Sequence, residues 1–329
     1  MNNVVIQVKD LFKWFPVRTG LFSAFFRTKK EFVHAVDGIS FDVRRGEILC
    51  LAGESGCGKT TTARVVLRLI EPTAGEIYYE GTDIVKLEKE ALRKLRADIQ
   101  MIFQDPYESL DPRMSIFNIL DEPLEYHHPN LTREEKRVRI LKALEDVRLI
   151  PPEDFAGRYT HELSGGQRQR VAVARSLILQ PKFIIADEPV SMLDASVRTE
   201  VLNVFTELQK KYNLTYLYIT HDLAQARYIG DRLIIMYLGQ IMEQGPMEDT
   251  VSAPQHPYTK ALISNVPIPN PTIQRERIMI KGETPTPINV PPGCRFHPRC
   301  PWRMVVCSEV EPELKPLGKD WLARCHLLT

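Results

Sequence analysis

The stretch Gly53-Glu54-Ser55-Gly56-Cys57-Gly58-Lys59-Thr60 decides the fold of this chain, because it fits the pattern G-x-x-x-x-G-K-S/T. The run before it, residues 47–52, is nearly all apolar, as a buried parallel strand should be. After it, apolar side chains recur at the spacing of one helix face, at Ala63, Val66, Leu67 and Ile70. The stretch therefore lies between a predicted strand and a predicted helix.

This strand–loop–helix context predicts a phosphate-binding loop. Glycines let backbone N–H groups curl around phosphate oxygens, and the helix N-terminus adds the positive end of a dipole. We expect Lys59 to reach the β- and γ-phosphates and the Thr60 hydroxyl to hold Mg²⁺. The expected nucleotide contacts are Gly53, Ser55, Gly56, Cys57, Gly58, Lys59, Thr60 and Thr61. The alternative, a chance glycine-rich turn, does not explain the flanking strand and helix.

Length, charge and hydropathy narrow the class of protein. A chain of 329 residues suggests about two domains at roughly 150 residues each. The net charge of +1 gives no electrostatic argument for binding nucleic acid. No apolar run approaches the roughly 18 residues that a transmembrane helix needs. The first residues lack the pattern of a secretory signal, so we expect the chain to stay in the cytosol.

Alternation of short strands and helices predicts an α/β fold with a parallel sheet covered on both faces. We expect this core to comprise residues 1–104 and 171–248. The pattern predicts a helix at residues 199–212 and strands at residues 4–8, 35–43, 77–79, 99–103, 183–186, 215–220 and 232–238.

Two regions differ from this pattern. Residues 105–170 have helical spacing and a capping-box sequence at Thr132–Glu135, and predict a helical subdomain inserted into the core. Residues 249–329 predict a small extension rich in proline and cysteine, with little helical periodicity. The basic and aromatic residues 17–32 are either a contact with a membrane-embedded partner or a solvated insertion.

Five further motifs accompany the loop in a fixed order. They are Gln104 at the end of a strand, Leu163-Ser164-Gly165-Gly166-Gln167 before a helical run, Asp187-Glu188 at the end of a buried strand, Ser191-Met192-Leu193-Asp194, and Thr220-His221-Asp222 after the next strand. Together with the loop, this set resembles the full motif set of the ATP-binding-cassette (ABC) ATPases. The resemblance implies a P-loop NTPase core of RecA-like type and ATP hydrolysis with Mg²⁺.

The resemblance also implies roles in hydrolysis. Asp187 and Gln104 would help Thr60 to hold Mg²⁺, as oxygen ligands do. Glu188 would polarise the attacking water as general base, and His221 would contact the γ-phosphate. Gln104 would also sense the water and link the core to the helical subdomain. The alternatives are that Glu188 is a salt-bridged surface acid and that His221 has only a structural role.

Other implied roles concern adenine and a second subunit. Phe15, or its neighbour Trp14, resembles the aromatic that stacks on adenine, and the spacing favours Phe15. Ser164, Gly165, Gly166 and Gln167 would complete the ATP site of a partner subunit, with Asp194 organising that contact. Two subunits would then pack head to tail.

Two strings narrow the resemblance further. Residues 254–262 (Pro-Gln-His-Pro-Tyr-Thr-Lys-Ala-Leu) and 293–301 (Gly-Cys-Arg-Phe-His-Pro-Arg-Cys-Pro) look like the C-terminal extension of oligopeptide/dipeptide importer ATPases. This implies a paralogous ATPase partner, two transmembrane permease subunits, an extracellular substrate-binding protein acting indirectly, and a peripheral place at the cytoplasmic face of the membrane. Related importers carry peptides, oligosaccharides or metal chelates.

Four of the six cysteines, Cys294, Cys300, Cys307 and Cys325, lie in the extension without the C-x-x-C pairing of zinc fingers. Some members of the resembled subfamily bind a 4Fe–4S cluster through such cysteines, and thiolates suit this cluster. Zinc, with His297 or His326 as a further ligand, and unligated or oxidised thiols are the alternatives. Cys50 and Cys57 are expected to be core and loop filler.

Two other functions are compatible with some of these motifs. A cassette ATPase of DNA repair or translation would need a nucleic-acid surface or a second cassette, and the neutral charge and single cassette argue against both. A catalytically silent regulatory subunit would not need both Glu188 and His221. The leading interpretation is the ATP-hydrolysing subunit of an importer.

Overall fold

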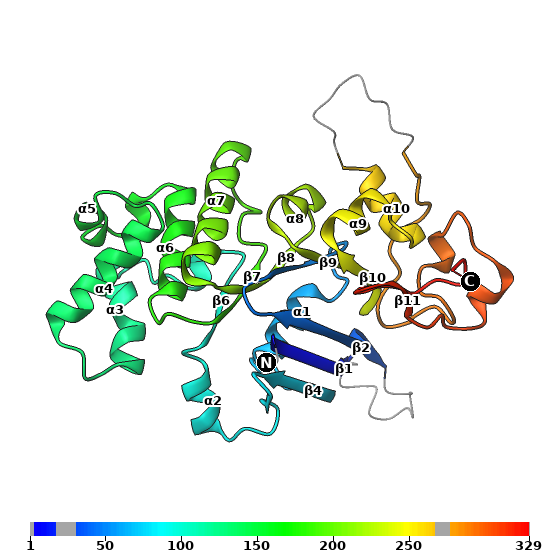
Figure 1. Ribbon diagram of the computed structural model, residues 1–329, viewed down its shortest axis with the longest axis horizontal. Helices are drawn as coiled ribbons and strands as arrows, with labels where there is room; N and C mark the ends of the chain where they lie inside the picture. The colour runs from blue at the N-terminus through cyan, green and yellow to red at the C-terminus, as the bar shows by residue number, and fades with distance from the viewer. Residues whose placement is uncertain (1–2, 18–30, 267–276, 329) are drawn as a thin grey trace, which may run out of the picture. The chain divides into compact units, whose positions relative to one another are not determined.

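The computed structural model describes residues 3–17, 31–266 and 277–328 (Figure 1). The chain forms two compact units, each built from several segments. The first unit contains Met1–Val5, Val43–Ile48 and Lys86–Ile219. The second contains Ile6–Asp42, Leu49–Val85 and Thr220–Thr329. Most of the basic and aromatic stretch at residues 17–32 falls on residues 18–30, outside the described part of the chain.

The first unit has a parallel sheet in the order β6-β7-β8 (Ile99–Ile102, Phe183–Asp187 and Thr215–Thr220). Ile99 pairs with Phe183, and Phe183 pairs with Thr215. Every residue of β7 and β8 is buried, as expected for parallel strands covered on both faces. The parallel arrangement predicted from the apolar runs is therefore confirmed for these strands.

Six α-helices of the first unit accompany these strands: α2 (Lys89–Leu95), α3 (Ile116–His127), α4 (Arg133–Asp146), α5 (Pro152–Ala156), α6 (Gly165–Leu177) and α7 (Ala195–Tyr212). Helices α3 to α6 gather together (Figure 1). A 3-10 turn precedes α3, η2 (Pro106–Glu108), and another precedes α6, η3 (Thr160–Glu162). The predicted capping box of α4 is present, since the Glu135 N–H donates to the Thr132 hydroxyl and the Glu135 carboxylate accepts from the Thr132 N–H.

Helix α7 begins four residues before its predicted start, at Ala195, because polar residues hide the first turn from an apolar pattern. Helix α6 continues beyond residue 170, where the sequence placed the end of the helical subdomain. The predicted domain boundaries remain predictions.

The second unit contains an antiparallel sheet that the sequence analysis did not separate from the parallel one. Its order is β2-β1-β4-β5 (Phe32–Arg44, Val4–Pro16, Ala74–Tyr79 and Thr82–Asp83). Strand β1 runs well past Val8, where the predicted strand ends. The prediction is too short because a register shift between Lys9 and Phe12 interrupts the alternation of side chains. Pairing then resumes at Phe12 with Ala74.

The second unit also has a mixed sheet in the order β3-β9-β10-β12-β11. Strand β3 (Ile48–Ala52) lies parallel to β9 (Arg232–Tyr237), with α1 (Lys59–Val66) and α8 (Leu223–Ile229) following β3 and β8 along the chain. Strand β10 (Gln240–Pro246) returns antiparallel to β9 through a tight turn at Leu238 and Gly239, both with positive φ. Two short strands of the extension, β12 (Trp321–Ala323) and β11 (Lys315–Gly318), continue the sheet antiparallel. The sequence analysis missed β10 to β12.

The first part of the extension is helical, although its sequence shows little helical periodicity. Helices α9 (Met247–Ser252) and α10 (Pro257–Ser264) lie there, followed by the 3-10 turns η4 (His297–Arg299) and η5 (Val305–Ser308). Each helix has at most eight residues, too few to give a clear apolar period.

An aromatic core holds the extension to the rest of the second unit. The Phe296 side chain is fully buried, and its ring centroid lies 5.4 Å from Tyr237 of β9 and 5.2 Å from Tyr258 of α10. The buried imidazole of His256 packs 5.8 Å from the same ring. Burial lowers the pKa of His256 to about 3, so this ring is neutral in the folded protein.

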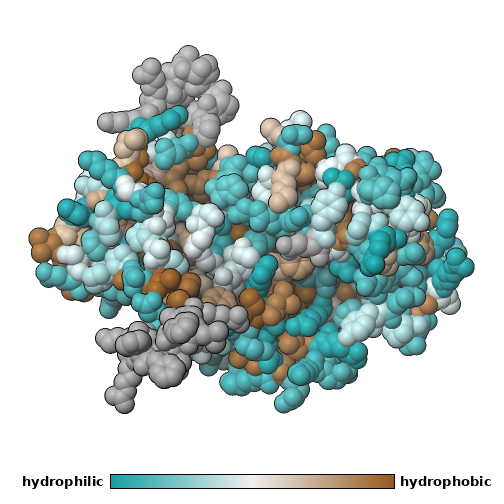
Figure 2. Space-filling view, turned by 180° about the vertical axis from the view of Figure 1, so that it is seen from behind, coloured by the Kyte–Doolittle hydropathy of each residue, from teal (hydrophilic) through white to brown (hydrophobic). Residues whose placement is uncertain are grey.

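No helix in the described part of the chain is long and apolar enough to cross a membrane. The face drawn in Figure 2 is mostly hydrophilic, with separate hydrophobic patches rather than one continuous band.

We expect Phe296→Ala to lower the free energy of unfolding by about 3–5 kcal/mol, because it removes a fully buried ring and leaves a cavity. Val305→Ala is the control, since Val305 is 79% exposed and should change stability by no more than about 0.5 kcal/mol. Denaturant titration followed by tryptophan fluorescence measures both. Equal effects of the two substitutions would contradict an aromatic core under the extension.

Candidate nucleotide site

The phosphate loop (residues 53–60) connects β3 to α1 in the second unit. Gly58, the N-cap of α1, has φ 108°, and a Cβ atom there would lie 2.1 Å from the backbone oxygen of Ala35. Only glycine fits so close an approach with this backbone conformation. The tight curl of the loop is therefore fixed by backbone packing.

Lys59 is almost completely buried beside the loop that precedes it. Its ammonium group donates to the backbone oxygens of Gly53 (2.9 Å) and Glu54 (3.1 Å). The Cys57 thiol lies 3.9 Å away, and its burial raises its pKa, so it is a neutral filler as expected. Ser55, Gly56 and Thr60 are exposed. The loop thus presents exposed polar groups around one buried cation, as phosphate binding requires.

His221 lies in the turn between β8 and α8 and is exposed. Its neighbours fix this turn: the Asp222 carboxylate caps α8 by accepting from the Ala224 N–H (2.9 Å), and the Asp222 N–H donates to the Thr220 hydroxyl (3.0 Å). The turn therefore holds the backbone of His221 in one place at the end of a strand.

The two candidate adenine-stacking residues have different surroundings. The Trp14 indole N–H donates to the Asp37 carboxylate at 2.7 Å, and its ring lies 4.5 Å from His34. Phe15 is partly exposed, with the Lys13 ammonium 4.9 Å from its ring centroid. Trp14 is therefore engaged in a hydrogen bond and a ring contact, and stacking of adenine on Phe15 stays a prediction.

The first unit contains the carboxylates. Asp187, buried to 97%, ends β7, and Glu188 follows it with φ 46°, a conformation that is strained for a residue with a side chain. The Glu188 N–H donates to Ile219 O at 2.9 Å, which fixes this conformation. The Gln104 side-chain amide donates to the Glu188 carboxylate at 3.5 Å. The structure thus brings Gln104 and Glu188 together, 84 residues apart in sequence.

Residues 164–167 form the start of α6 in the first unit. The Ser164 hydroxyl accepts from the Gln167 N–H (3.3 Å), and the Gln167 side chain accepts from the Ser164 N–H (3.0 Å). The motif is therefore both a helix cap and a helix N-terminus with an exposed serine. Asp194 is the exposed N-cap residue of α7.

Helices α6 and α7 approach closely where the signature motif begins. A Cβ atom on Gly166 would lie 2.2 Å from Cγ1 of Val197, and one on Gly165 would lie 3.4 Å from Cδ2 of Leu193. The two glycines therefore link the position of residues 164–167 to the start of α7, next to Asp194.

Three contacts to the phosphate loop come from residues that the sequence analysis did not assign to the site. The Glu54 carboxylate accepts from Arg299 and Thr284, and the Glu54 N–H donates to the Tyr258 hydroxyl. These partners lie 245, 230 and 204 residues further along the chain. No local pattern in the sequence could indicate such distant pairs.

The four cysteines of the extension are all free thiols, three of them buried and Cys300 partly buried. Burial, together with the nearby Cys325, Cys307 and Cys300, raises the pKa of Cys294 to about 11. The described residues contain no group of three or more His, Cys, Asp or Glu side chains arranged to hold a metal ion. The rings of His297 and His326 contact backbone oxygens of Cys294 and Val310, both at 2.8 Å. Each contact uses one ring nitrogen, Nδ1 of His297 and Nε2 of His326.

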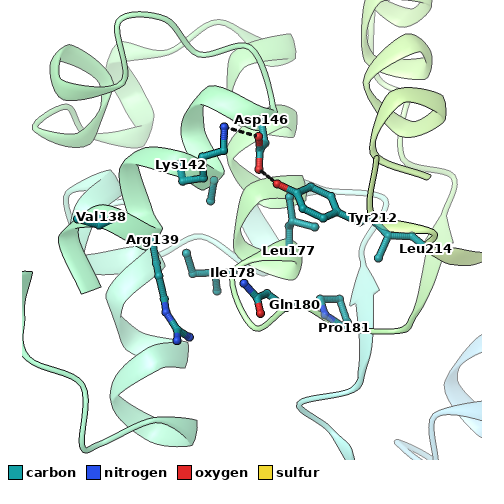
Figure 3. A pocket seen from close by; sticks show the side chains of 11 residues that line it. Val138, Arg139, Lys142, Asp146, Leu177, Ile178, Gln180, Pro181, Tyr212 and Leu214 are labelled. Atoms are coloured by element: carbon teal, nitrogen blue, oxygen red, sulfur yellow. Dashed lines mark hydrogen bonds and ion pairs between the residues drawn. The ribbon is translucent and has the colours of Figure 1, made fainter. Parts of the chain in front are cut away.

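Two of the cavities in the described part of the chain lie in the first unit. One, of about 370 Å³, lies between α4, the end of α6 and the end of α7 (Figure 3). In it the Asp146 carboxylate pairs with Lys142 (3.3 Å) and accepts from the Tyr212 hydroxyl, and burial raises the pKa of Tyr212 to about 12. None of the motif residues lines this cavity, and the contact between Asp146 and Tyr212 connects α4 to α7. The other, of about 510 Å³, is lined by residues 107 and 109–114 together with Ile119, Glu122 and Arg175.

Gly166→Ala should lower the free energy of unfolding by about 1–3 kcal/mol, because the added methyl group collides with Val197 and forces α6 and α7 apart. Gly157→Ala is the matched control: its φ is −79° and nothing lies within 4 Å of an added Cβ. The control should leave stability unchanged or raise it by about 0.4–1 kcal/mol. Thermal or denaturant unfolding distinguishes them, and two equal effects would refute the close helix contact.

Comparison with known proteins identifies the family of the chain. The ABC transporter family matches residues 36–191, and the oligopeptide/dipeptide transporter C-terminal region matches residues 242–307. Among solved structures, the dimeric bacterial ABC transporter cassette MJ0796 is similar with a TM-score of 0.64 and 30% identity, over 74% of this chain and 98% of that one. CbiO1 of Clostridium perfringens is similar with a TM-score of 0.65 and 26% identity, over 77% of this chain and 92% of that one.

The similarity to curated proteins extends along the whole chain. The chain is 47% identical over 329 residues to the oligopeptide transport ATP-binding protein AppF of Bacillus subtilis, covering 99% of this chain and 98% of that protein. It is 48% identical over 301 residues to the putative oligopeptide transport ATP-binding protein YkfD of the same bacterium, covering 91% of each. The chain therefore belongs to the family of ABC transporter ATP-binding proteins, and it is an ATPase of the P-loop fold.

Proposed function

We propose that this ATPase powers the import of peptides through a membrane transporter, and that the candidate site residues described above carry its chemistry. The contact between Gln104 and Glu188, next to the buried Asp187, is the observation that best supports the hydrolytic assignment. The peptide assignment is supported by the oligopeptide transport relatives and by the matching C-terminal region. Oligosaccharides remain the other substrate class.

ATP binding is assigned to the second unit. Lys59 contacts the β- and γ-phosphates, the N–H groups of residues 55–61 surround them, and Phe15 stacks on adenine. Bound Mg²⁺ would neutralise charge on the phosphates. The oxygen donors Thr60, Gln104 and Asp187 suit this hard cation.

Hydrolysis is assigned to Glu188, which takes a proton from the attacking water as general base. Its strained backbone and its contact with Gln104 hold the carboxylate in position, in the way that strain is used at functional sites. His221 contacts the γ-phosphate and helps to orient the water.

Glu188→Gln should slow ATP hydrolysis by roughly 100- to 10,000-fold, the usual contribution of a general base, while ATP binding persists and the closed dimer accumulates. Glu207→Gln, which changes an exposed acid paired with Arg148 in the same unit, is the control. Phosphate release and nucleotide titration measure the two quantities. An unchanged turnover of the Glu188 variant would rule it out as the base.

The ATP site is proposed to be completed by a second ATPase subunit. Residues 164–167 supply the helix N-terminus that contacts the partner's γ-phosphate, and Asp194 lies beside the same glycine contacts. The similar cassette MJ0796 is dimeric. We propose a head-to-tail pair with a paralogous subunit, in which residues 164–167 of each subunit contact the nucleotide on the phosphate loop of the other.

Two transmembrane permease subunits are the proposed membrane partners. The cavity at residues 107–114 lies shortly after Gln104 in the chain, so a permease segment there can report on the nucleotide site. Binding there places the chain at the cytoplasmic face of the membrane. An extracellular substrate-binding protein acts through the permeases. A DNA-repair or translation role has no comparable support in the charge of +1.

We also propose that Cys294, Cys300, Cys307 and Cys325 hold a 4Fe–4S cluster. Cys300, Cys307 and Cys325 lie close enough to Cys294 to contribute to its raised pKa, and four such thiols form a suitable donor set. Their side chains would have to reorient on loading, since the described residues are not arranged as a metal-binding group.

Protein purified without oxygen should be brown and carry about four irons per chain. Cys300→Ser should lower the iron content, whereas Cys50→Ala, which removes a buried thiol outside the extension, should not. Elemental analysis decides: zinc without iron would favour the zinc alternative, and neither metal would refute the proposal.

A further inference from the structure

Two residues of the C-terminal extension, Arg299 and Thr284, donate hydrogen bonds to the side chain of Glu54. Arg299 donates two hydrogen bonds to its carboxylate, at 2.8 and 3.2 Å, and Thr284 donates a third. Both Arg299 and Glu54 are largely buried, with 10% and 25% of their side chains exposed. A bidentate guanidinium–carboxylate pair in this setting fixes orientation as well as charge.

The backbone of Glu54 is held as well. Its N–H donates at 3.0 Å to the hydroxyl of Tyr258, a fully buried residue of α10. Its backbone oxygen accepts from the Lys59 ammonium at 3.1 Å. One residue of the phosphate loop therefore contacts the extension through its N–H and carboxylate, and the loop lysine through its carbonyl.

Arg299 is itself well positioned. Its guanidinium also donates to the hydroxyls of Tyr237 (3.3 Å) and Thr284 (3.1 Å), and it lies 5.7 Å from the Tyr237 ring centroid. Burial alone would raise the pKa of Glu54, but the hydrogen bonds from Arg299 and Thr284 outweigh it and lower that pKa below its usual value. Glu54 is therefore a carboxylate whose charge depends on Arg299 for compensation.

The extension contacts a second segment of the candidate nucleotide site. The buried Arg295 donates to the carboxylate of Asp37, which also accepts from the Trp14 indole at 2.7 Å. The backbone oxygen of Pro287 accepts from the His34 N–H at 2.9 Å. Two arginines four residues apart thus reach carboxylates on two separate segments, and one of these carboxylates is bonded to Trp14, the sequence neighbour of Phe15.

We propose that Arg299 is a positioning residue for ATP binding, which acts through Glu54 to hold the phosphate loop and to neutralise a carboxylate beside the phosphates. The C-terminal extension is then a part of the nucleotide site. This rests on the proposed assignment of residues 53–60 to phosphate binding. Without Arg299, the loop loses its anchor and the uncompensated Glu54 charge repels the nucleotide.

The test is titration of fluorescent ATP into the purified full-length chain. Arg299→Ala should weaken ATP binding by about 5- to 150-fold, the range of typical coupling between linked sites. Arg299→Lys should retain part of the affinity, because the charge stays but the two-pronged geometry is lost. Arg303→Ala is the matched control, since it removes an exposed arginine from the same extension.

Charge rescue distinguishes positioning from a general loss of structure. Glu54→Gln in the Arg299→Ala background should recover most of the ATP affinity, because it removes the uncompensated carboxylate. If Arg299→Ala unfolds the extension, Tyr258→Phe replaces it, since it removes only the hydroxyl that accepts from the Glu54 N–H. Circular dichroism and melting curves establish the fold of each variant.

The outcomes are separable. ATP affinity within about twofold of wild type in Arg299→Ala, with loss of binding in Lys59→Ala, would overturn the role of Arg299 while leaving the loop assignment intact. Full affinity in Lys59→Ala would overturn the loop assignment itself. Equal losses in the Arg299 and Arg303 variants, or no recovery with Glu54→Gln, would also overturn the proposal.

Discussion

The close approach of the phosphate loop to the backbone at Ala35 is the constraint on which the second unit depends. Because Gly58 lies against that backbone oxygen, the chain must curl sharply between β3 and α1. The curl brings the backbone oxygens of Gly53 and Glu54 onto the Lys59 ammonium, which is thereby buried without losing hydrogen-bond partners. A cation held in this way is ready for phosphate, and the exposed polar residues of the loop surround it.

The extension is part of the same physical system. Its strands continue the sheet beyond β10, its aromatic residues form a buried core with Tyr237, and its arginines reach Glu54 and Asp37. Each arginine contact buries a charged group together with its partner, which makes the burial of these charges tolerable. A proline-rich segment with two short helices is therefore ordered by what it packs against rather than by its own secondary structure.

In the first unit, the corresponding constraint is the meeting of β7, α6 and α7. The apolar strand delivers Asp187 and Glu188 to its carboxyl end, and the small Gly166 lets α6 lie against Val197. The capping box of Ser164 and Gln167 then fixes where α6 begins. The family resemblance found in the sequence agrees with the similar solved structures, which share this cassette fold.

Local patterns in the sequence determined the elements whose signals lie within a few residues: the loop between β3 and α1, the buried strands β7 and β8, and the capping box of α4. They did not determine the separate antiparallel sheet, because the bulge after Lys9 hides the pairing of β1, nor β10 to β12 and the short helices α9 and α10. Only the tertiary structure decided that Gln104 meets Glu188 and that Arg299 and Tyr258 meet Glu54. These partners are 84 to 245 residues apart, and a pattern of neighbours along the chain carries no information about side chains that folding alone brings together.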